Sequence, residues 1–221
     1  MKERLSEEVI AMRAVKELKE GDYCNLGIGL PQFCASYVPE GVQVQTENGA
    51  LGYGPLLTME NIDQVNADMA DAGARFFSRA PGMCFFDLLT SFAMIRSGRL
   101  TSILGGLEVS ERGDLAIHST SETSGFPQIG GSMDLAWGAK KLIVTMTHTT
   151  KDGKPKIVKD LSLPRSSRWC VDIIVTDIAV IEVQPDGLLL REVAPGWTAE
   201  EVQSLTEAHL KLANDLKEME L

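Results

Sequence analysis

The chain alternates short apolar segments of strand length with segments whose apolar residues recur at helical spacing. The strand candidates cover residues 23–29, 42–46, 101–104, 142–147, 171–176 and 179–183. The helical patterns cover residues 5–18, 31–37, 85–96 and 133–141. Because parallel strands need a long crossover connection, which is usually a helix, this alternation predicts an α/β fold. We expect a single open, mostly parallel sheet flanked by helices.

The last fifty residues interrupt this alternation. Pro185, Asp186 and Gly187 separate two apolar segments, IAVIEV and LLLREV, and this spacing predicts a late antiparallel ribbon. Residues 198–216 are acidic and amphipathic, and they predict a closing helix with Thr198 as its cap. The 221 residues contain no repeat and no low-complexity linker, so we expect one domain over residues 1–221.

Composition excludes several classes of protein. Hydrophobic residues make up 44% and charged residues 24% of the chain, which is typical of a globular fold. A net charge of −10 argues against a nucleic-acid partner, because binding to a phosphate backbone depends on lysine and arginine. The apolar runs are shorter than the roughly 18 residues of a membrane span. The charged first residues do not resemble a signal peptide, so we expect a cytoplasmic protein with no membrane partner.

The candidate metal ligands are scattered. Four cysteines and three histidines show no CxxC pair and no spacing typical of a metal site, so we expect no bound metal. We interpret the cysteines as reduced and structurally inert. These residues are Cys24, Cys34, Cys84, Cys170, His118, His148 and His209. His148 follows a predicted strand, and we expect it at the edge of a cleft.

One carboxylate stands where a predicted strand gives way to a glycine-rich loop. Glu47 and Asn48 follow residues 42–46, and the loop continues to Pro55 through three glycines. Ligands of open α/β sheets bind at the carboxyl ends of strands, and glycine lets the backbone approach a ligand closely. The loop lacks the Lys-Ser/Thr of a phosphate loop, and residues 25–31 lack the third glycine of a dinucleotide fingerprint. From these residues alone, a solvated glutamate in a turn remains the alternative.

Seven segments, taken in order, resemble one family. They are residues 25–31 (NLGIGLP), 47–55 (ENGALGYGP), 91–96 (SFAMIR), 109–116 (VSERGDLA), 130–141 (GGSMDLAWGAKK), 176–180 (TDIAV) and 193–196 (VAPG). Together they resemble the B (β) subunit of family I coenzyme A transferases, the 3-oxoacid CoA-transferase group. The resemblance runs over nearly the whole chain and implies the CoA-transferase (NagB/RpiA-like) fold.

The resemblance also implies a chemistry and a partner. It makes Glu47 the nucleophile that moves coenzyme A from an acyl-CoA to a carboxylate through a glutamyl-CoA thioester, with ping-pong kinetics. Coenzyme A is then a substrate, and no permanently bound cofactor is needed. A separate A (α) subunit completes the enzyme as a hetero-oligomer, for example α2β2. Oxyanion stabilisation or CoA binding is implied for Gly130, Gly131, Asn48, Gly49, Gly52 and Gly54.

Several alternatives stay open at this level. A tight turn with no catalytic role is the alternative for Gly130 and Gly131. Water in place of the acceptor would make the chain an acyl-CoA hydrolase, and a related fold without chemistry would be a ligand-binding module. Residues 140–168 are locally basic, which suits CoA phosphates, a solvated hairpin or an intersubunit contact.

The sequence departs from the family pattern near three segments. Thr46 replaces a common serine before the Glu-Asn-Gly motif, and Thr90 stands where an acidic residue often precedes residues 91–96. Ile117 and His118 replace the Asn-Trp that usually follows residues 109–116. We therefore do not assume acetoacetate, succinate or 3-oxoadipate as the substrate.

Overall fold

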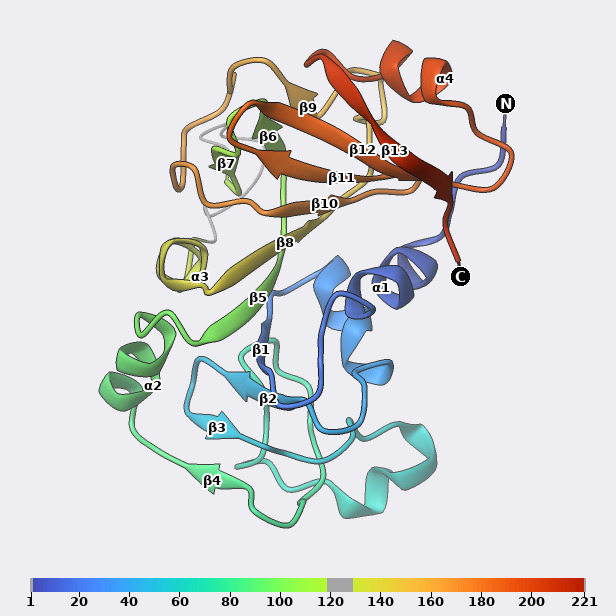
Figure 1. Ribbon diagram of the computed structural model, residues 1–221. Helices are drawn as coiled ribbons and strands as arrows, with labels where there is room; N and C mark the ends of the chain where they lie inside the picture. The colour runs from blue at the N-terminus through green and yellow to red at the C-terminus, as the bar shows by residue number, and fades with distance from the viewer. Residues whose placement is uncertain (1, 119–128, 221) are drawn as a thin grey trace.

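A ten-stranded sheet forms the centre of the computed structural model, which describes residues 2–118 and 129–220 (Figure 1). The strand order is β13-β12-β11-β10-β8-β5-β1-β2-β3-β4. The strands are β1 (Tyr23–Leu26), β2 (Gln43–Thr46), β3 (Ala50–Leu51), β4 (Cys84–Phe85), β5 (Leu100–Gly105), β8 (Lys141–Thr145), β10 (Ile173–Val175), β11 (Ala179–Gln184), β12 (Gly187–Val193) and β13 (Leu210–Glu218).

The middle of this sheet is parallel and is flanked by antiparallel pairs, and the edge strand β13 pairs in parallel with β12. Strands β10, β8, β5, β1 and β2 pair in parallel. Strands β3 and β4 add antiparallel pairs on one side, and β11 and β12 do so on the other. The predicted α/β class and late ribbon are thus confirmed. The β3–β4 edge was not predicted, because two-residue strands leave no periodic pattern in the sequence.

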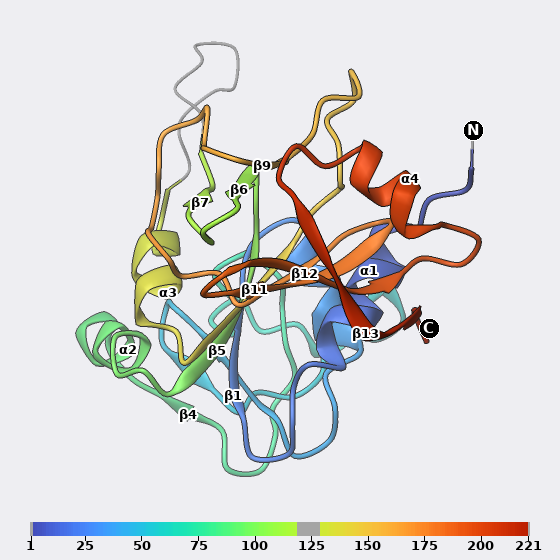
Figure 2. The same ribbon diagram turned by 45° about the horizontal axis from the view of Figure 1, so that its top comes forward.

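Helices cover both faces of the parallel strands. Ile103 and Ile143 belong to one apolar cluster, whereas their neighbours Leu104 and Leu142 belong to another. Successive strand residues point to opposite faces, so the two clusters lie on opposite sides of the sheet. The first is covered by α1 (Glu7–Val15) and the 3₁₀ helix η1 (Leu30–Ser36), and the second by α2 (Leu88–Ile95) and α3 (Ser132–Gly138). Figures 1 and 2 show α2 and α3 side by side.

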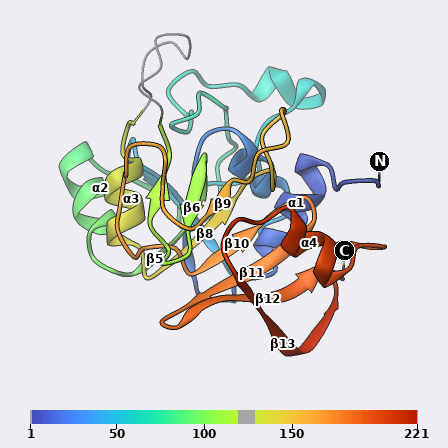
Figure 3. The same cartoon turned by 90° about the horizontal axis from the view of Figure 1, so that it is seen from above.

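A small second sheet lies beside the main one. It consists of β7 (Leu115–Ala116), β6 (Glu108–Ser110) and β9 (Ile157–Val158), in that order. Figure 3 shows these short strands from above, next to β8 and β10. A further 3₁₀ helix, η2 (Met59–Gln64), follows the glycine-rich loop. Neither feature has a sequence period long enough to predict it.

The predicted closing helix over residues 198–216 is wrong beyond its first turns. Thr198 caps α4 as expected, but the helix covers only Ala199–Ser204 and the chain then extends into β13. The Gln203 side chain ends the helix by donating to the carbonyls of Thr206 and Ala208. Its Oε1 accepts from the Leu210 N–H. Strand β13 pairs with the edge of β12 and buries Leu210 in the core, so tertiary context overrides helical propensity.

Other element bounds also differ from the predicted ranges. The helix expected over residues 85–96 begins only at Leu88, because Asp87 caps it by accepting from the Thr90 N–H. The pattern at residues 133–141 ends early, since Lys141 already pairs with Thr101 in the sheet. Residues 31–37 form a 3₁₀ helix in place of an α-helix.

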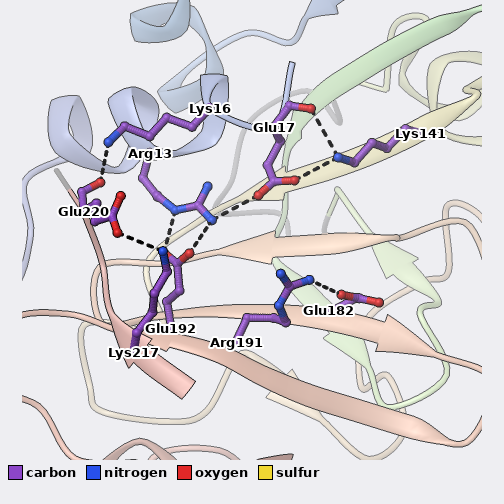
Figure 4. Close-up of polar contacts among 9 residues, drawn as sticks. All are labelled: Arg13, Lys16, Glu17, Lys141, Glu182, Arg191, Glu192, Lys217 and Glu220. Carbon is purple, nitrogen blue, oxygen red and sulfur yellow. Dashed lines mark hydrogen bonds and ion pairs between the residues drawn. The ribbon is translucent and has the colours of Figure 1, made fainter. Parts of the chain in front are cut away.

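An ionic network joins the first helix to the last strands (Figure 4). The buried Arg13 guanidinium on α1 forms two hydrogen bonds to Glu192 on β12, at 2.7 and 3.0 Å. Arg13 also pairs with Glu17, which in turn pairs with Lys141 at 2.9 Å. Both charged neighbours favour the ionised carboxylate, so the pKa of Glu17 is lowered despite its partial burial. The network holds α1 against the sheet through residues far apart in the sequence.

A buried histidine ties α4 to the end of β8. His148 Nδ1 lies 3.0 Å from Thr176 Oγ1, and Nε2 lies 2.8 Å from Thr206 Oγ1. The ring is fully buried, and burial lowers the pKa of His148 to about 4. The folded protein therefore holds this imidazole neutral, whereas an unfolded chain protonates it near pH 6.5.

We expect the free energy of unfolding to fall as the pH drops from 6.5 towards 4, because only the unfolded state then binds a proton at His148. The full effect of this residue is about 3 kcal/mol. Urea unfolding across this range measures it. His148→Gln should flatten the pH dependence, whereas the exposed His209→Gln should not; equal slopes in the wild type and in His148→Gln would contradict the assignment.

Candidate functional site

A cavity of about 690 Å³ opens at the carboxyl ends of β1, β2, β5 and β8. Strand β1 pairs with β2 on one side and with β5 on the other. The order of the strands in the sheet therefore reverses at β1. Such a reversal separates the loops that follow neighbouring strands and leaves a crevice between them. Among the described residues, the lining includes Glu47 after β2, Gly27 after β1 and Gly106 after β5.

Glu47 stands in the turn directly after β2 and is half-buried in this cavity. Burial raises the pKa of its carboxyl, because a charged group loses hydration there. The backbone N–H of Gly131 lowers the pKa by hydrogen bonding to the carboxylate, and the nearby Asp134 raises it. The side chain is thus poorly hydrated and held by a backbone donor from another element.

Gly130 and Gly131 lie against the Glu47 carboxylate at the start of α3. Gly130 has a left-handed backbone with a φ of 48°. At Gly131 a Cβ would overlap Glu47 Oε2 and would lie 3.0 Å from Phe92 Cζ. Only glycine leaves room for the carboxylate at this point. The structure thus brings together three of the residues selected from the sequence, and all three line the cavity.

The remaining loop residues do not line the cavity. Asn48 accepts a hydrogen bond from the Thr46 hydroxyl and donates to the Ala70 carbonyl, so its side chain ties the loop to the following segment. Gly49 has a φ of 110°, and a Cβ there would overlap the Phe86 carbonyl. These contacts position the turn that carries Glu47.

Gly52 and Gly54 support the same hairpin from its far side. The Gly52 N–H donates to the Val44 carbonyl at 2.8 Å, and the Gly54 N–H donates to the Ser78 carbonyl at 2.9 Å. A Cβ at Gly54 would lie 2.5 Å from Ser78 Oγ. Gly52 has a left-handed φ of 69° and packs against the Gln43 side chain, so contacts within the chain account for both glycines.

A buried polar layer beneath Glu47 is absent from the sequence-based candidates. Asn25 on β1 donates to Gln45 Oε1 on β2 at 2.5 Å, and Gln45 donates to Ser91 Oγ at 2.8 Å. All three side chains are buried. Polar residues at inward positions of short strands are the signal that could have found them. Asn25 also lines the cavity, so this layer connects the sheet to the site.

Three of the four residues that depart from the family pattern, Thr46, Ile117 and His118, line the cavity. Thr46 accepts from the Ala72 N–H and so fixes the segment opposite the glutamate. Ile117 and His118 both line the cavity, and His118 Nδ1 lies 3.1 Å from Ser166 Oγ. Thr90 lies in the first turn of α2, outside the described lining. The two unusual residues at 117 and 118 therefore face the space available to a ligand.

The expectation for His148 is wrong: its ring lies in the core, outside the described lining. The basic stretch over residues 140–168 divides in the fold. Four of its cations are paired with carboxylates of this chain: Lys140 with Asp22, Lys141 with Glu17, Lys154 with Asp152 and Arg165 with Asp114. Lys156 is the one lysine or arginine of the stretch that lines the described part of the cavity.

The described residues contain neither a candidate metal site nor a helix that could span a membrane. Across residues 2–118 and 129–220, no group of three or more His, Cys, Asp or Glu side chains could hold a metal ion. No helix in these ranges is long and apolar enough to cross a membrane. Cys24 and Cys34 are buried and Cys84 is exposed, all as free thiols.

Comparisons with known proteins agree with this geometry. The family profile described as Coenzyme A transferase matches residues 8–205. The B subunit of a 3-oxoadipate CoA-transferase from Acinetobacter baylyi is 42% identical, over 94% of this chain and 95% of the relative. The beta subunit of an acetate CoA-transferase from Escherichia coli is 39% identical, over 94% of each.

One solved structure shows the same fold. It is an acyl-CoA transferase from Escherichia coli O157:H7 in a thioester complex with CoA, with a TM-score of 0.74 and 19% identity. The match covers 100% of this chain and 44% of the solved chain. The present chain thus spans less than half the length of that protein.

We expect Gly131→Ala to raise the pKa of Glu47. The added methyl group displaces the carboxylate from the Gly131 N–H, and a carboxylate that loses a hydrogen bond is harder to ionise. A pH titration of glutamate carboxyl carbons by NMR measures the change.

Gly98→Ala is the matched control. It adds the same methyl group in the turn after α2, with nothing within 4 Å of the added Cβ, and its φ of 70° adds a backbone strain that Gly131, with a φ of −83°, does not have. The pKa of Glu47 should not change in this variant. An unchanged pKa in Gly131→Ala as well would show that Gly131 does not hold the carboxylate.

Proposed function

The chain belongs to the coenzyme A transferase family, and from that premise we propose that it is the subunit that carries the nucleophile, Glu47. One observation carries the proposal. A half-buried carboxylate sits at the switch point of the sheet, in the cavity, with a backbone N–H directed at it. Partial dehydration makes a carboxylate more reactive towards a carbonyl carbon, and the turn presents it to the open space.

The proposed reaction begins with an acyl-CoA in the cavity. The Glu47 carboxylate attacks the thioester carbonyl, the C–S bond breaks, and an acyl-glutamyl anhydride and CoA thiolate form. The thiolate then attacks the side-chain carbonyl of Glu47 and releases the first acid as its carboxylate. A glutamyl-CoA thioester remains. An acceptor carboxylate reverses these steps and leaves as the new acyl-CoA, so the thioester is conserved and no net redox change occurs.

The Gly131 N–H has a defined role in this scheme. It lies beside an oxygen of the Glu47 carboxylate and lowers the pKa of that carboxyl, so it also lies next to the carbon that the thiolate attacks. Negative charge develops on that same oxygen when the tetrahedral intermediate forms. The donor therefore stabilises the oxyanion on Glu47, whereas the oxyanion on the acyl carbon needs a donor from elsewhere.

We further propose a partner subunit, together with small-acid substrates. The two relatives are named as B and beta subunits, and the solved acyl-CoA transferase chain is more than twice as long as the segment matched here. An A (α) subunit that joins this chain in a hetero-oligomer such as α2β2 would supply the missing part. The relatives' names differ in the acid, 3-oxoadipate or acetate, at 42% and 39% identity. The acids proposed for this chain are accordingly 3-oxoacids or short-chain acids.

Trapping tests the nucleophile. The chain, co-expressed with its α subunit, is incubated with acyl-CoA and treated with borohydride or hydroxylamine, and the peptides are mapped by mass spectrometry. Glu47 should be the modified residue. A well-folded complex that carries no adduct at Glu47 with any donor would contradict the mechanism.

Substitution provides the second test. Glu47→Gln should reduce exchange by more than about 10⁴-fold, since the nucleophile is lost. Glu47→Asp should lose roughly 100-fold, because the shorter side chain withdraws the carboxylate. Glu40→Gln makes the same charge change in an exposed turn and should be neutral. Near-normal exchange in Glu47→Ala would contradict the proposal that Glu47 is the nucleophile.

The glycine that contacts Glu47 gives a third test. Gly131→Val should reduce turnover by roughly 100-fold or more while the protein remains folded, because the branched side chain occupies the position of the carboxylate. Steady-state kinetics and a thermal melt measure the two quantities. Normal kinetics in this variant would remove Gly131 from the mechanism.

The same complex separates transfer from hydrolysis. In a transferase, an added acceptor carboxylate accelerates loss of the starting thioester and a new acyl-CoA appears. In a hydrolase, the rate of thioester loss does not depend on the acceptor. The second result would show that water hydrolyses the glutamyl intermediate.

A further inference from the structure

The cavity that holds Glu47 also holds one unusual cation. Among its described lining residues, Lys156 is the only lysine or arginine, and the carboxylates there are Glu7 and Glu47. The side chain is half-buried. A positive charge in the cavity is notable because every substrate of the proposed reaction is an anion.

The backbone on either side holds Lys156 in place. Its N–H donates to the His148 carbonyl at 3.1 Å, and its own carbonyl accepts from the Val109 N–H at 2.9 Å. It directly precedes β9, the strand that joins the small sheet. Its Nζ lies 3.5 Å from Thr147 Oγ1, two residues beyond the end of β8. The side chain thus extends from a fixed backbone to the segment that follows the carboxyl end of β8.

Lys156 lacks the partner that other cations of its stretch have. No carboxylate of the described residues lies within 4 Å of its Nζ, unlike those of Lys140, Lys141 and Lys154. The nearby Asp177 pairs with Arg4 at 2.8 Å. Burial lowers the pKa of Lys156 to about 8, and Asp177 opposes the shift. A dehydrated ammonium group with one weak hydrogen bond is unfavourable by itself, and an anion brought in by a ligand would offset that penalty.

We propose that Lys156 binds an anionic oxygen group of the substrate, either a carboxylate or a phosphate, at the end of the cavity opposite Glu47. Lys156 Nζ contacts Thr147, which follows β8, and three strand spacings separate β8 from β2, so the ends of these two strands are about 14 Å apart. Lys156 therefore holds a part of the substrate remote from the thioester. It is a positioning residue, and the proposal rests on the function above only for the identity of the substrates.

The test compares Lys156→Met, Lys156→Arg and the control Lys154→Met in the complex with the α subunit. Lys154 is exposed and already paired with Asp152. In Lys156→Met we expect KM to rise roughly 10- to 100-fold, the effect of losing a charged hydrogen bond, with a smaller change in kcat. Lys156→Arg should restore much of the loss, and Lys154→Met should match the wild type. An unchanged KM for both substrates in a folded Lys156→Met would overturn the proposal.

Two pairs of probes identify the anion. If Lys156 holds a CoA phosphate, Lys156→Met should raise KM for acyl-CoA but not for the matching acyl-pantetheine, which has no phosphate. If it holds a carboxylate of the acid, the penalty is larger for succinate than for butyrate as acceptor. Either pattern supports the proposal. If the rise in KM is the same for acyl-CoA and acyl-pantetheine, and also the same for succinate and butyrate, the proposal is contradicted.

A pH profile provides a readout that a structural role would not change. KM of the wild type should rise above about pH 8, where Lys156 loses its proton, and Lys156→Arg should not show this rise. The other charged groups nearby are Arg4 and Asp177, which pair with each other, and the buried His148 is neutral. A wild-type profile that is flat to about pH 9.5 would count against the assignment.

Binding without turnover separates this inference from the proposed function. Calorimetric titration of CoA, succinate and butyrate into the wild-type and Lys156→Met complexes requires no reaction. If the wild-type complex exchanges no CoA, but the Lys156→Met complex binds one of these anions less tightly than the wild type does, the transferase function is refuted and the anion site is supported. A wild type that exchanges CoA, with equal binding by both proteins, would refute the site alone.

Discussion

The structure depends on a parallel sheet that is buried on both faces. Ile103 and Leu104 on β5, and Ile143 and Val144 on β8, are each almost fully excluded from water, with successive residues in opposite clusters. A sheet covered in this way has no solvated face on which to place polar chemistry, which leaves the strand ends. Because β2 and β5 flank β1, the loops at the carboxyl ends diverge and leave the cavity between them.

Within that cavity, the state of Glu47 results from two opposing effects. Burial favours the protonated carboxyl, whereas the Gly131 N–H favours the carboxylate. A fully hydrated carboxylate would be a weak nucleophile, and a protonated one would be none. The balance needs a backbone donor at close range, and such an approach is available only where residue 131 has no side chain. The absence of a side chain at residue 131 thus lets its backbone approach the carboxylate closely and oppose the effect of burial on the pKa of Glu47.

Local patterns predicted the elements that are determined locally. The alternation of Val42, Val44 and Thr46 and the turn signal after them located Glu47 at a strand end, which the structure bears out. The pairing of Leu210 with Leu188 is different, because the edge of β12 that β13 joins does not exist in a sequence window. The helix predicted there was therefore wrong.

The site shows the same division. Gly49, Gly52 and Gly54 look alike in the sequence, as glycines of one loop. In the structure each packs against a different residue, and these residues are Phe86, Gln43 and Ser78. The basic stretch likewise contains cations that look equivalent in sequence. Lys141 pairs with Glu17, which lies 124 residues away, and Lys156 faces the cavity. Long-range partners, which a single sequence does not reveal, decide these roles.

The contact between Arg13 and Glu192 has a consequence for how the protein is made. The two residues are separated by 179 positions, and Arg13 is buried only when both α1 and β12 are in place. At a translation rate of about 5 to 20 residues per second, Glu192 emerges roughly 10 to 40 s after Arg13. During that interval the apolar side of the nascent first helix, including Ile10 and Ala14, lacks part of its final covering. A chaperone that shields amphipathic helices on the ribosome would act on this segment first.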